Sequence, residues 1–326
     1  MRKIRTNLAI TLTLLAFLGV AVRTAAGPIE RIGKTVADVC GRECLKALVD
    51  AYLTAMVTHD PSRAPIAKNA KYTENTRVLP IGEGLWRSAS EQPSMFRVYV
   101  PDVSVQQVGF IGVLNESSNP TALTLRLKVE RRQITEIEQF VAPGLAQNTL
   151  DNLRSPRAGL LASVPPKERV SRERMLKIAD SYYESVVRSD GSVAPFADDC
   201  VRRENGLQTT GNPVLPPEIA EWSPIFALGC REQVNTRALS YIKSIDRRVQ
   251  IADPETGLVF AVSMFRRPEQ ERSIRIVGVA GLTTMARNFA PSTRAWAHVF
   301  KVQGGKLHEI EAMGGIVLDL NATSGW

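Results

Sequence analysis

The chain has 326 residues, a length that favours two domains, each large enough for its own hydrophobic core. Hydrophobic residues make up 44% of the chain and charged residues 23%, which is a globular composition and excludes disordered, collagen-like and coiled-coil proteins. The formal net charge is +8, and four of the basic residues lie within the first 26 positions.

The first 26 residues predict a secretory signal peptide. Arg2, Lys3 and Arg5 precede an apolar run over 8–22, and small residues lead up to Ala26. We expect cleavage after Ala26 and a secreted or periplasmic protein with no membrane attachment; a retained membrane anchor is the alternative. Cleavage lowers the net charge from +8 to +4, because the peptide carries four basic residues and no acid. The remaining charge is spread thinly, so we expect no nucleic-acid partner.

Comparison of the chain with itself predicts a tandem duplication. Residues 45–75 align with residues 175–205 at a constant offset of 130, and ten of the 31 positions are identical. Unrelated segments of this length would share about two. Later matches lie at offsets of 151 and 173, so the second copy contains two loop insertions. We expect the following division of the chain: a signal peptide at 1–26, a first domain at 27–142, a linker at 143–170 and a second domain at 171–326.

Each copy begins with an amphipathic helix followed by strands. Apolar residues recur at helical spacing from Leu45 to Met56 and again from Met175 to Val186, and breakers near Asp60 and Asp190 end the helices. Alternating segments then predict strands at 96–100, 105–113, 123–129 and 134–141 in the first copy, and at 248–251, 258–265, 274–279, 296–302 and 307–313 in the second.

Four cysteines in an exported chain suggest two disulfides. We favour Cys200 with Cys230, which leaves Cys40 with Cys44, a pair that would need a distorted helix start. A metal site at Cys40-x3-Cys44 is the alternative, but it lacks a second pair of ligands. The chain has no metal or cofactor motif, so we expect neither metal nor cofactor.

Several motifs carry a resemblance to known proteins. They are Cys40-Gly-Arg-Glu-Cys44-Leu45, Thr73-Glu74-Asn75, Gly82-Glu-Gly-Leu-Trp86, Ile134-Thr-Glu-Ile-Glu138 and Asp246-Arg-Arg248 leading to Asp253-Pro-Glu-Thr-Gly257. The chain resembles a secreted, mainly fungal two-copy family of unknown function, built on the nuclear transport factor 2-like cone of the SnoaL-like cyclases, dehydratases and isomerases. The resemblance implies an α+β fold with two paired cones, each a helix packed on a curved antiparallel sheet. It implies chemistry only by analogy.

The closing hairpin of each copy suggests a site. A two-residue turn at Arg131-Arg132 would set Glu136 and Glu138 opposite inward-facing leucines. The corresponding turn at Gly304-Gly305 would set Glu309 opposite Phe300 and Glu311 opposite His298. We therefore expect these carboxylates to point into an apolar concavity, where burial raises the pKa of a carboxyl group.

These placements predict an acid–base site. The catalytic candidates are the couple of His298 and Glu311, with Glu309 beside it and Glu136 and Glu138 in the first copy. In the alternative interpretation, the glutamates are paired with arginines or backbone donors and serve only the fold. Candidate substrate-binding residues on the helices, turns and strand faces are Tyr52, Asp60, Glu74, Trp86, Tyr182, Asp190, Trp296 and Phe300.

Two functions remain open at this point. The first is a cofactor-free lyase, isomerase or cyclase acting on a small, largely apolar molecule. The second is a noncatalytic module of the same fold that binds such a molecule or pairs domains.

Overall fold

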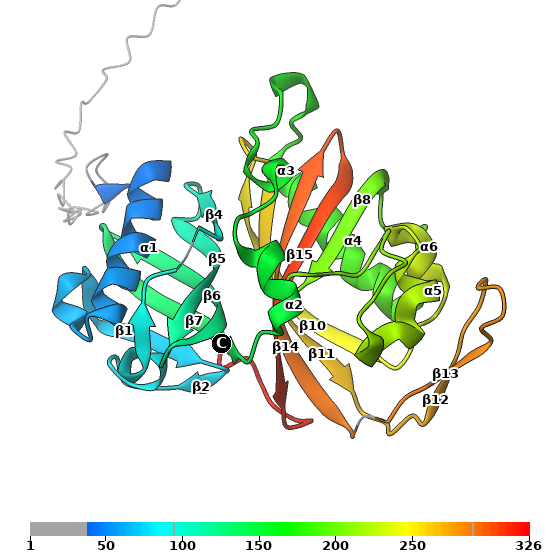
Figure 1. The fold of residues 1–326 in the computed structure, drawn as a ribbon. Coiled ribbons are helices and arrows are strands. Elements are labelled where there is room, and N and C mark those ends of the chain that lie inside the picture. The colour runs from blue at the N-terminus through cyan, green and yellow to red at the C-terminus, as the bar shows by residue number, and fades with distance from the viewer. Residues whose placement is uncertain (1–37, 94, 289) are drawn as a thin grey trace, which may run out of the picture. The chain divides into compact units, whose positions relative to one another are not determined.

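The computed structural model describes residues 38–93, 95–288 and 290–326, so the predicted signal peptide lies outside the described residues. The described residues belong to one compact unit of α+β class, dominated by two large sheets (Figure 1). The expected α+β class is confirmed. Within this part of the chain, none of the helices has the length and apolar character needed to cross a membrane.

The first half, residues 38–143, consists of one long helix and a seven-stranded sheet. Helix α1 (Arg42–Val57) buries Leu45, Val49, Tyr52 and Met56, as the helical spacing predicts. The sheet has the order β2-β1-β7-β6-β5-β3, with β4 also paired to β5. Its elements are η2 (Pro61–Arg63), β1 (Ile66–Glu74), β2 (Arg77–Val78), η3 (Gly84–Arg87), β3 (Ala89–Glu91), β4 (Arg97–Asp102), β5 (Gln107–Glu116), β6 (Asn119–Glu130) and β7 (Gln133–Pro143).

The second half, residues 171–326, has the same order of main elements around a six-stranded sheet, β10-β11-β14-β15-β8-β9. Ser171 caps α4 (Arg172–Arg188) by accepting a hydrogen bond from the Arg174 amide at 3.2 Å. The other elements are β8 (Phe196–Glu204), β9 (Leu207–Gln208), η6 (Pro217–Trp222), α5 (Ser223–Phe226), α6 (Cys230–Asn235), β10 (Ser244–Asp253), β11 (Leu258–Arg267), β12 (Ser273–Arg275), β13 (Thr284–Ala286), β14 (Ser292–Gln303) and β15 (Lys306–Leu318).

Two features of the sheets depart from the sequence expectations. Strands β1 and β8 follow the helices directly and pair in parallel with the closing strands β7 and β15, but the apolar pattern did not predict either strand. The strand expected at 274–279 is wrong in its bounds: β12 covers only Ser273–Arg275 and pairs with β13 outside the main sheet. This hairpin lies where the second insertion is expected, and η6, α5 and α6 lie where the first insertion is expected.

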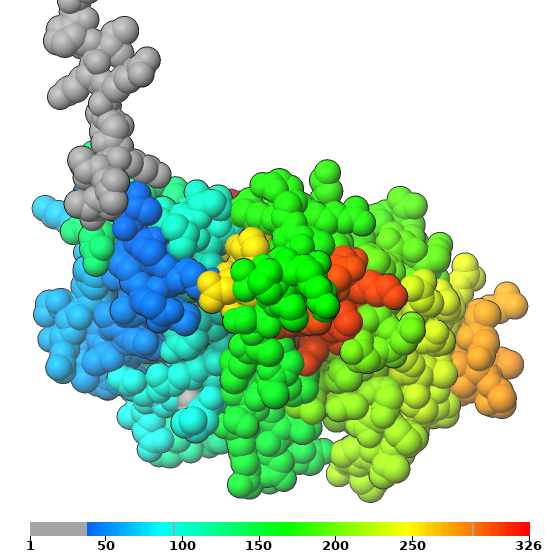
Figure 2. All heavy atoms as spheres, turned by 90° about the horizontal axis from the view of Figure 1, so that it is seen from above, coloured from blue at the N-terminus to red at the C-terminus, as the bar shows by residue number. Residues whose placement is uncertain are grey.

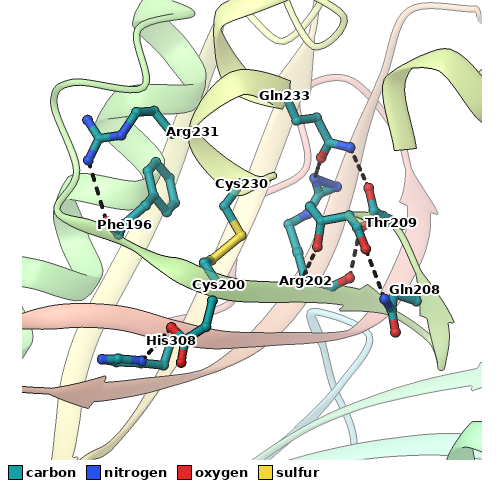
Figure 3. The surroundings of a disulfide bond; sticks show 11 residues. Phe196, Cys200, Arg202, Gln208, Thr209, Cys230, Arg231, Gln233 and His308 are labelled. Atoms are coloured by element: carbon teal, nitrogen blue, oxygen red, sulfur yellow. Dashed lines mark hydrogen bonds and ion pairs between the residues drawn. A yellow bond between two sulfur atoms is a disulfide. The ribbon is translucent and has the colours of Figure 1, made fainter. Parts of the chain in front are cut away.

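Both predicted disulfides are confirmed. Cys40 and Cys44 are joined at a Cα separation of 5.1 Å, and Cys200 and Cys230 at 5.9 Å. The second bond fastens the inserted helix α6 to β8 (Figure 3). It therefore ties the first insertion to the main sheet.

The segment between the halves contains four short helical turns: α2 (Gln147–Leu150), η4 (Asp151–Leu153), α3 (Ala158–Leu161) and η5 (Pro166–Glu168). Leu153 and Leu160 are buried in a core shared with strands of both halves. Lys301 on β14 donates to the Ala162 carbonyl, and the Val164 amide donates to the Glu255 carbonyl at 2.8 Å. In Figure 2 the green atoms of this segment lie beside the orange-red atoms of the closing hairpin.

The core shared by the halves forms where the sheet faces away from α1 and α4 meet. Val98, Val100 and Ile111 of the first sheet pack with Phe260, Val299 and Met313 of the second. At Gly109 the approach is so close that an added Cβ would lie 2.2 Å from Cγ of Phe260, so only glycine fits there.

Two ion pairs connect the halves reciprocally. Arg42 at the start of α1 pairs with Asp253 at the end of β10, and Arg172 at the start of α4 pairs with Asp102 at the end of β4, at 2.7 Å. The two arginines are 130 positions apart and the two aspartates 151 apart, which are the offsets of the internal repeat.

Candidate functional site

The second half contains a cavity of about 130 Å³ between α4 and the sheet. Its wall combines aromatic rings with several charged side chains. The residues that line it are Tyr182, Arg202, Glu204, Leu239, Tyr241, Ile242, Phe265, Arg267, Arg294, Trp296, His298 and Ala312. Three residues predicted from the sequence, Tyr182, Trp296 and His298, therefore meet at one cavity.

Strand alternation explains which side chains reach this cavity. On β14, Arg294, Trp296 and His298 are spaced by two and share the face toward α4. Phe265 pairs with Arg294 across β11 and β14, which sets Arg267 on the same face one step along. Leu239, Tyr241 and Ile242 come from the end of the first insertion. The segment expected as the first insertion thus supplies part of the cavity wall.

His298 is buried among rings. Its centroid lies 5.6 Å from that of Phe300 and 5.7 Å from that of Phe265, both in stacked orientation, and its Nδ1 lies 3.3 Å from Oγ of Ser263. Burial, followed by the positive charge of Arg202, lowers the pKa of His298 from 6.5 to about 3. The imidazole is therefore neutral at physiological pH, and it can exchange hydrogen bonds with a ligand without carrying charge.

The predicted couple of His298 and Glu311 does not form, because the hairpin register is shifted by one residue. A bulge after the Gly304-Gly305 turn lets Val302 pair with Leu307 but Lys301 with Glu309. His298 consequently faces Ala312, and Glu311 faces Val299. Both turn glycines have positive φ, as predicted, yet a slip of one residue moves a side chain to the other face of the sheet.

Glu309 and Glu311 instead contact Arg157 of the linker. Arg157 pairs through Nε with Glu309, and its Nη1 lies 3.0 Å from Oε2 of Glu311. Glu311 is completely buried, and this burial raises its pKa from 4.5 to about 7 against the opposing charges of Arg157 and Arg203. The carboxylates are inside the protein, but they lie on the face away from the cavity.

The first half has the same register shift, so Glu136 and Glu138 do not enter its apolar interior. Val129 pairs with Ile134 but Lys128 with Glu136, which leaves Thr135 as the extra residue of the bulge. Arg126 then binds Glu136 through Nη1 and Glu138 through Nε, each at 2.8 Å. Burial opposes ionisation, but hydrogen bonds from Arg126 and Lys128 leave the pKa of Glu136 below its ordinary value. The expected inward-facing carboxylates are wrong in both halves.

In the first half, the positions that correspond to the cavity wall hold largely buried side chains that bond to one another. Tyr52 donates to Oε1 of Gln139 at 2.8 Å and accepts from Nε1 of Trp86 at 3.2 Å. Glu74 accepts from the Tyr72 hydroxyl at 2.8 Å and from Gln139 at 2.9 Å. The predicted Tyr52, Glu74 and Trp86 are thus brought together, in a closed hydrogen-bonded network.

The remaining predicted residues lie apart from the cavity lining. Asp60 and Asp190 each accept hydrogen bonds from a serine two positions later, Ser62 and Ser192, and these bonds lower the aspartate pKa values. Both aspartates cap the turn after a helix. Phe300 is buried behind His298 and packs on Tyr182 and Tyr183 at centroid distances of 5.4 and 5.7 Å.

The sequence did not predict the arginines that line the cavity. Arg202 donates from Nη1 to Oε1 of Gln233 at 2.7 Å and pairs with Glu204, so α6 and β8 hold its guanidinium between them (Figure 3). At an offset of 130, Arg202 corresponds to Tyr72, and this change from ring to cation was the available signal. Among the described residues, no group of three or more His, Cys, Asp or Glu side chains could hold a metal ion.

One family model matches the second half of the chain. Residues 168–314 match the model of a family described as a domain of unknown function (DUF8021). No curated protein matches the chain. A solved de novo designed protein with a curved β-sheet is 12% identical, with a TM-score of 0.27, over 44% of this chain and 88% of that one. A protein named as a polyketide cyclase, from Xanthomonas campestris pv. campestris, is 15% identical, with a TM-score of 0.25, over 44% of this chain and 90% of that one.

Proposed function

We propose that the second half is a small-molecule-binding domain of the cone type, and that its ligand occupies the cavity between α4 and the sheet. The observation that carries this proposal is the cavity itself, about 130 Å³ in volume, with aromatic walls and a few polar groups. Ligand sites in proteins are usually concave and mostly apolar, with a few polar groups that orient the ligand. Since a cavity of about 150 Å³ accommodates benzene, the ligand would be a small, largely apolar molecule of one ring.

Binding without catalysis fits the electrostatics of the cavity. The glutamates expected to transfer protons lie on the opposite sheet face, against Arg157. Within the described residues, Glu204 is the one carboxylate that lines the cavity, and it is ion-paired with Arg202. With a pKa of about 3, His298 is too weak a base to hold a proton at neutral pH.

A cofactor-free lyase, isomerase or cyclase is the second candidate, because His298 and Glu204 line the same cavity. A neutral imidazole can donate a hydrogen bond to a substrate carbonyl, as the histidine of triosephosphate isomerase does. Glu204 would then accept the proton from the adjacent carbon and return it elsewhere. This enzyme would act on the same class of molecule.

The other expectations remain proposals with structural support. We propose that residues 27–142 and 171–326 arose by duplication and pair as two cones joined by a linker at 143–170. The reciprocal ion pairs of Arg42 with Asp253 and of Arg172 with Asp102 support this origin. We also propose export after cleavage of residues 1–26, which the two disulfides support.

Retention of small molecules tests the binding proposal. The mature protein is incubated with a metabolite extract, washed and analysed by mass spectrometry. Ala312→Phe introduces a ring into the cavity and should abolish retention, whereas Val78→Phe adds the same ring at an exposed position of β2 in the first half and should not. Equal retention by wild type and Ala312→Phe would show that the cavity is not the binding site.

The same experiment separates the two candidates. A binding domain returns its ligand chemically unchanged. An enzyme converts it, and Glu204→Gln should then stop conversion while the ligand is still retained. Unchanged turnover by Glu204→Gln would exclude Glu204 as the base.

A further inference from the structure

The charge of the cavity indicates what its ligand carries. Among the described residues that line it, Arg202, Arg267 and Arg294 are cationic and Glu204 is anionic, while His298 is neutral. Guanidinium groups do not deprotonate in proteins, so the lining has a permanent excess of two positive charges. Most sites for neutral apolar molecules need no such excess.

Two of these cations are close neighbours on one sheet face. Arg294 pairs with Phe265 across β11 and β14, and Arg267 is two residues beyond Phe265. Diagonal neighbours of this kind lie about 7–8 Å apart between backbones, within reach of long side chains. Burial, and then the charge of Arg294, lowers the pKa of Arg267. The sheet therefore holds two like charges together where water is partly excluded.

A further guanidinium stands next to this pair. Arg287 stacks on the Trp222 ring at 3.6 Å and lies 5.3 Å from the ring of Tyr241, which also faces Arg267 at 6.0 Å. Ring faces offset part of the cost of burying a cation. Glu221 contributes a negative charge near Arg287, so the cations that an anionic ligand would meet in the cavity are those of the lining.

The rest of the wall is apolar. Trp296, Phe265 and Tyr182 also line the cavity with their rings. Inorganic phosphate would leave this surface without a partner. A molecule with a flat ring and a carboxylate would fit both the apolar wall and the arginines. Its ring would pack on the aromatic side chains, and a guanidinium can bind its carboxylate through two parallel hydrogen bonds.

We propose that the cavity binds an organic carboxylate with a single flat apolar ring, its carboxylate held by Arg267 and Arg294 and its ring among Trp296, Phe265 and Tyr182. This inference rests on the proposed function, since it concerns the same cavity. It adds the charge and the shape that the ligand must have.

Calorimetric titration with three probes tests the inference: benzoate, its neutral isostere benzamide, and inorganic phosphate. We expect benzoate to bind at least about tenfold more tightly than benzamide, since hydrogen bonds to charged groups are the strong ones, and phosphate to bind more weakly than benzoate. Arg294→Gln should remove the preference for benzoate. The charge-matched control Arg63→Gln, at an exposed turn of the first half, should keep it.

Two further variants distinguish failure of this inference from failure of the cavity proposal. Arg294→Lys retains the charge and should still prefer benzoate over benzamide, which guards against a folding defect in Arg294→Gln. Ala312→Phe should abolish the binding of both ring probes. Equal binding of benzoate and benzamide, both lost in Ala312→Phe, would overturn the anion inference and leave the cavity proposal standing. Benzoate binding that survives Ala312→Phe, or no binding of any probe, would overturn both.

Discussion

The burial of Glu311, on the sheet face away from α4, can be tested by measuring how protein stability depends on pH. Its carboxyl group has a pKa raised from 4.5 to about 7 by burial, partly opposed by Arg157 and Arg203. Glu311→Gln replaces it with a side chain of similar shape that does not titrate. The difference in the free energy of unfolding between wild type and Glu311→Gln should therefore depend on pH.

The sign follows from the two pKa values. Below pH 4.5 the group is protonated in both the folded and the unfolded chain, and its contribution to stability is fully present. As the pH rises toward 7, the unfolded chain releases the proton while the folded protein retains it, so the contribution is lost. A difference of about 2.5 pKa units corresponds to about 3 kcal/mol. Wild type should lose this amount relative to Glu311→Gln between pH 4 and pH 8.

Urea denaturation followed by tryptophan fluorescence at several pH values measures the difference. Glu136→Gln is the matched control, since Glu136 lies on the corresponding strand of the first half but has a lowered pKa. The stabilising contribution of Glu136 is present above its ordinary pKa of 4.5 and is lost on acidification. The difference in the free energy of unfolding between wild type and Glu136→Gln should therefore change in the opposite direction, and below about pH 4.5. If the difference in the free energy of unfolding between wild type and Glu311→Gln stays constant from pH 4 to 8, the pKa of Glu311 is not raised by burial.

Three further predictions concern an ion pair, a disulfide and a core contact that stabilise the fold. Arg157→Met should destabilise the protein by about 3–5 kcal/mol at pH 8, where Glu311 loses its partner while charged, and by less at pH 5, as urea titration at both values would show. Replacing Cys200 and Cys230 together by serine opens a link between residues 30 positions apart and should lower the free energy of unfolding by about 3–4 kcal/mol, provided that unfolding is compared in oxidised samples. Phe260→Ala empties the core between the sheets and should cost about 3–5 kcal/mol; a cost below about 1 kcal/mol would mean that this contact is not tight.

The sequence predicted the two long helices, the disulfides and the hairpin turns well because each depends on local chemistry. Helical spacing identified the buried face of α1 and α4, and the residue pairs at both hairpin tips have the positive φ that such turns require. The register failed because a bulge adds one residue without changing composition. A signal was present: Ile134 and Ile137 are both buried, as are Leu307 and Ile310, and a spacing of three cannot place two residues on one face of a regular strand.

The cavity could be predicted only in part. His298, Trp296 and Tyr182 stood out as rings on a strand face and a helix face. Arg267 and Arg294 did not, because arginine is common on surfaces and these two converge only through the pairing of β11 with β14. No local pattern shows that an insertion closes over them.

The two halves differ in the side chains that occupy the space between the long helix and the sheet. Gln139 and Ala312 occupy equivalent positions at an offset of 173, and the glutamine amide fills the space that the alanine leaves open. Trp86 on η3 also packs in the interior of the first half, and the second half has the expected first insertion in place of η3. The counter-charge of the carboxylates on the sheet faces away from the helices also differs. Arg126 of the neighbouring strand and Arg248 of β10 pair with Glu138. In the second half Val299 stands at the position of Arg126, and Arg157 of the linker pairs with Glu311. The interior polar side chains of the first half thus bond to one another, whereas the second half has Ala312 at the position of Gln139 and keeps a cavity for a ligand.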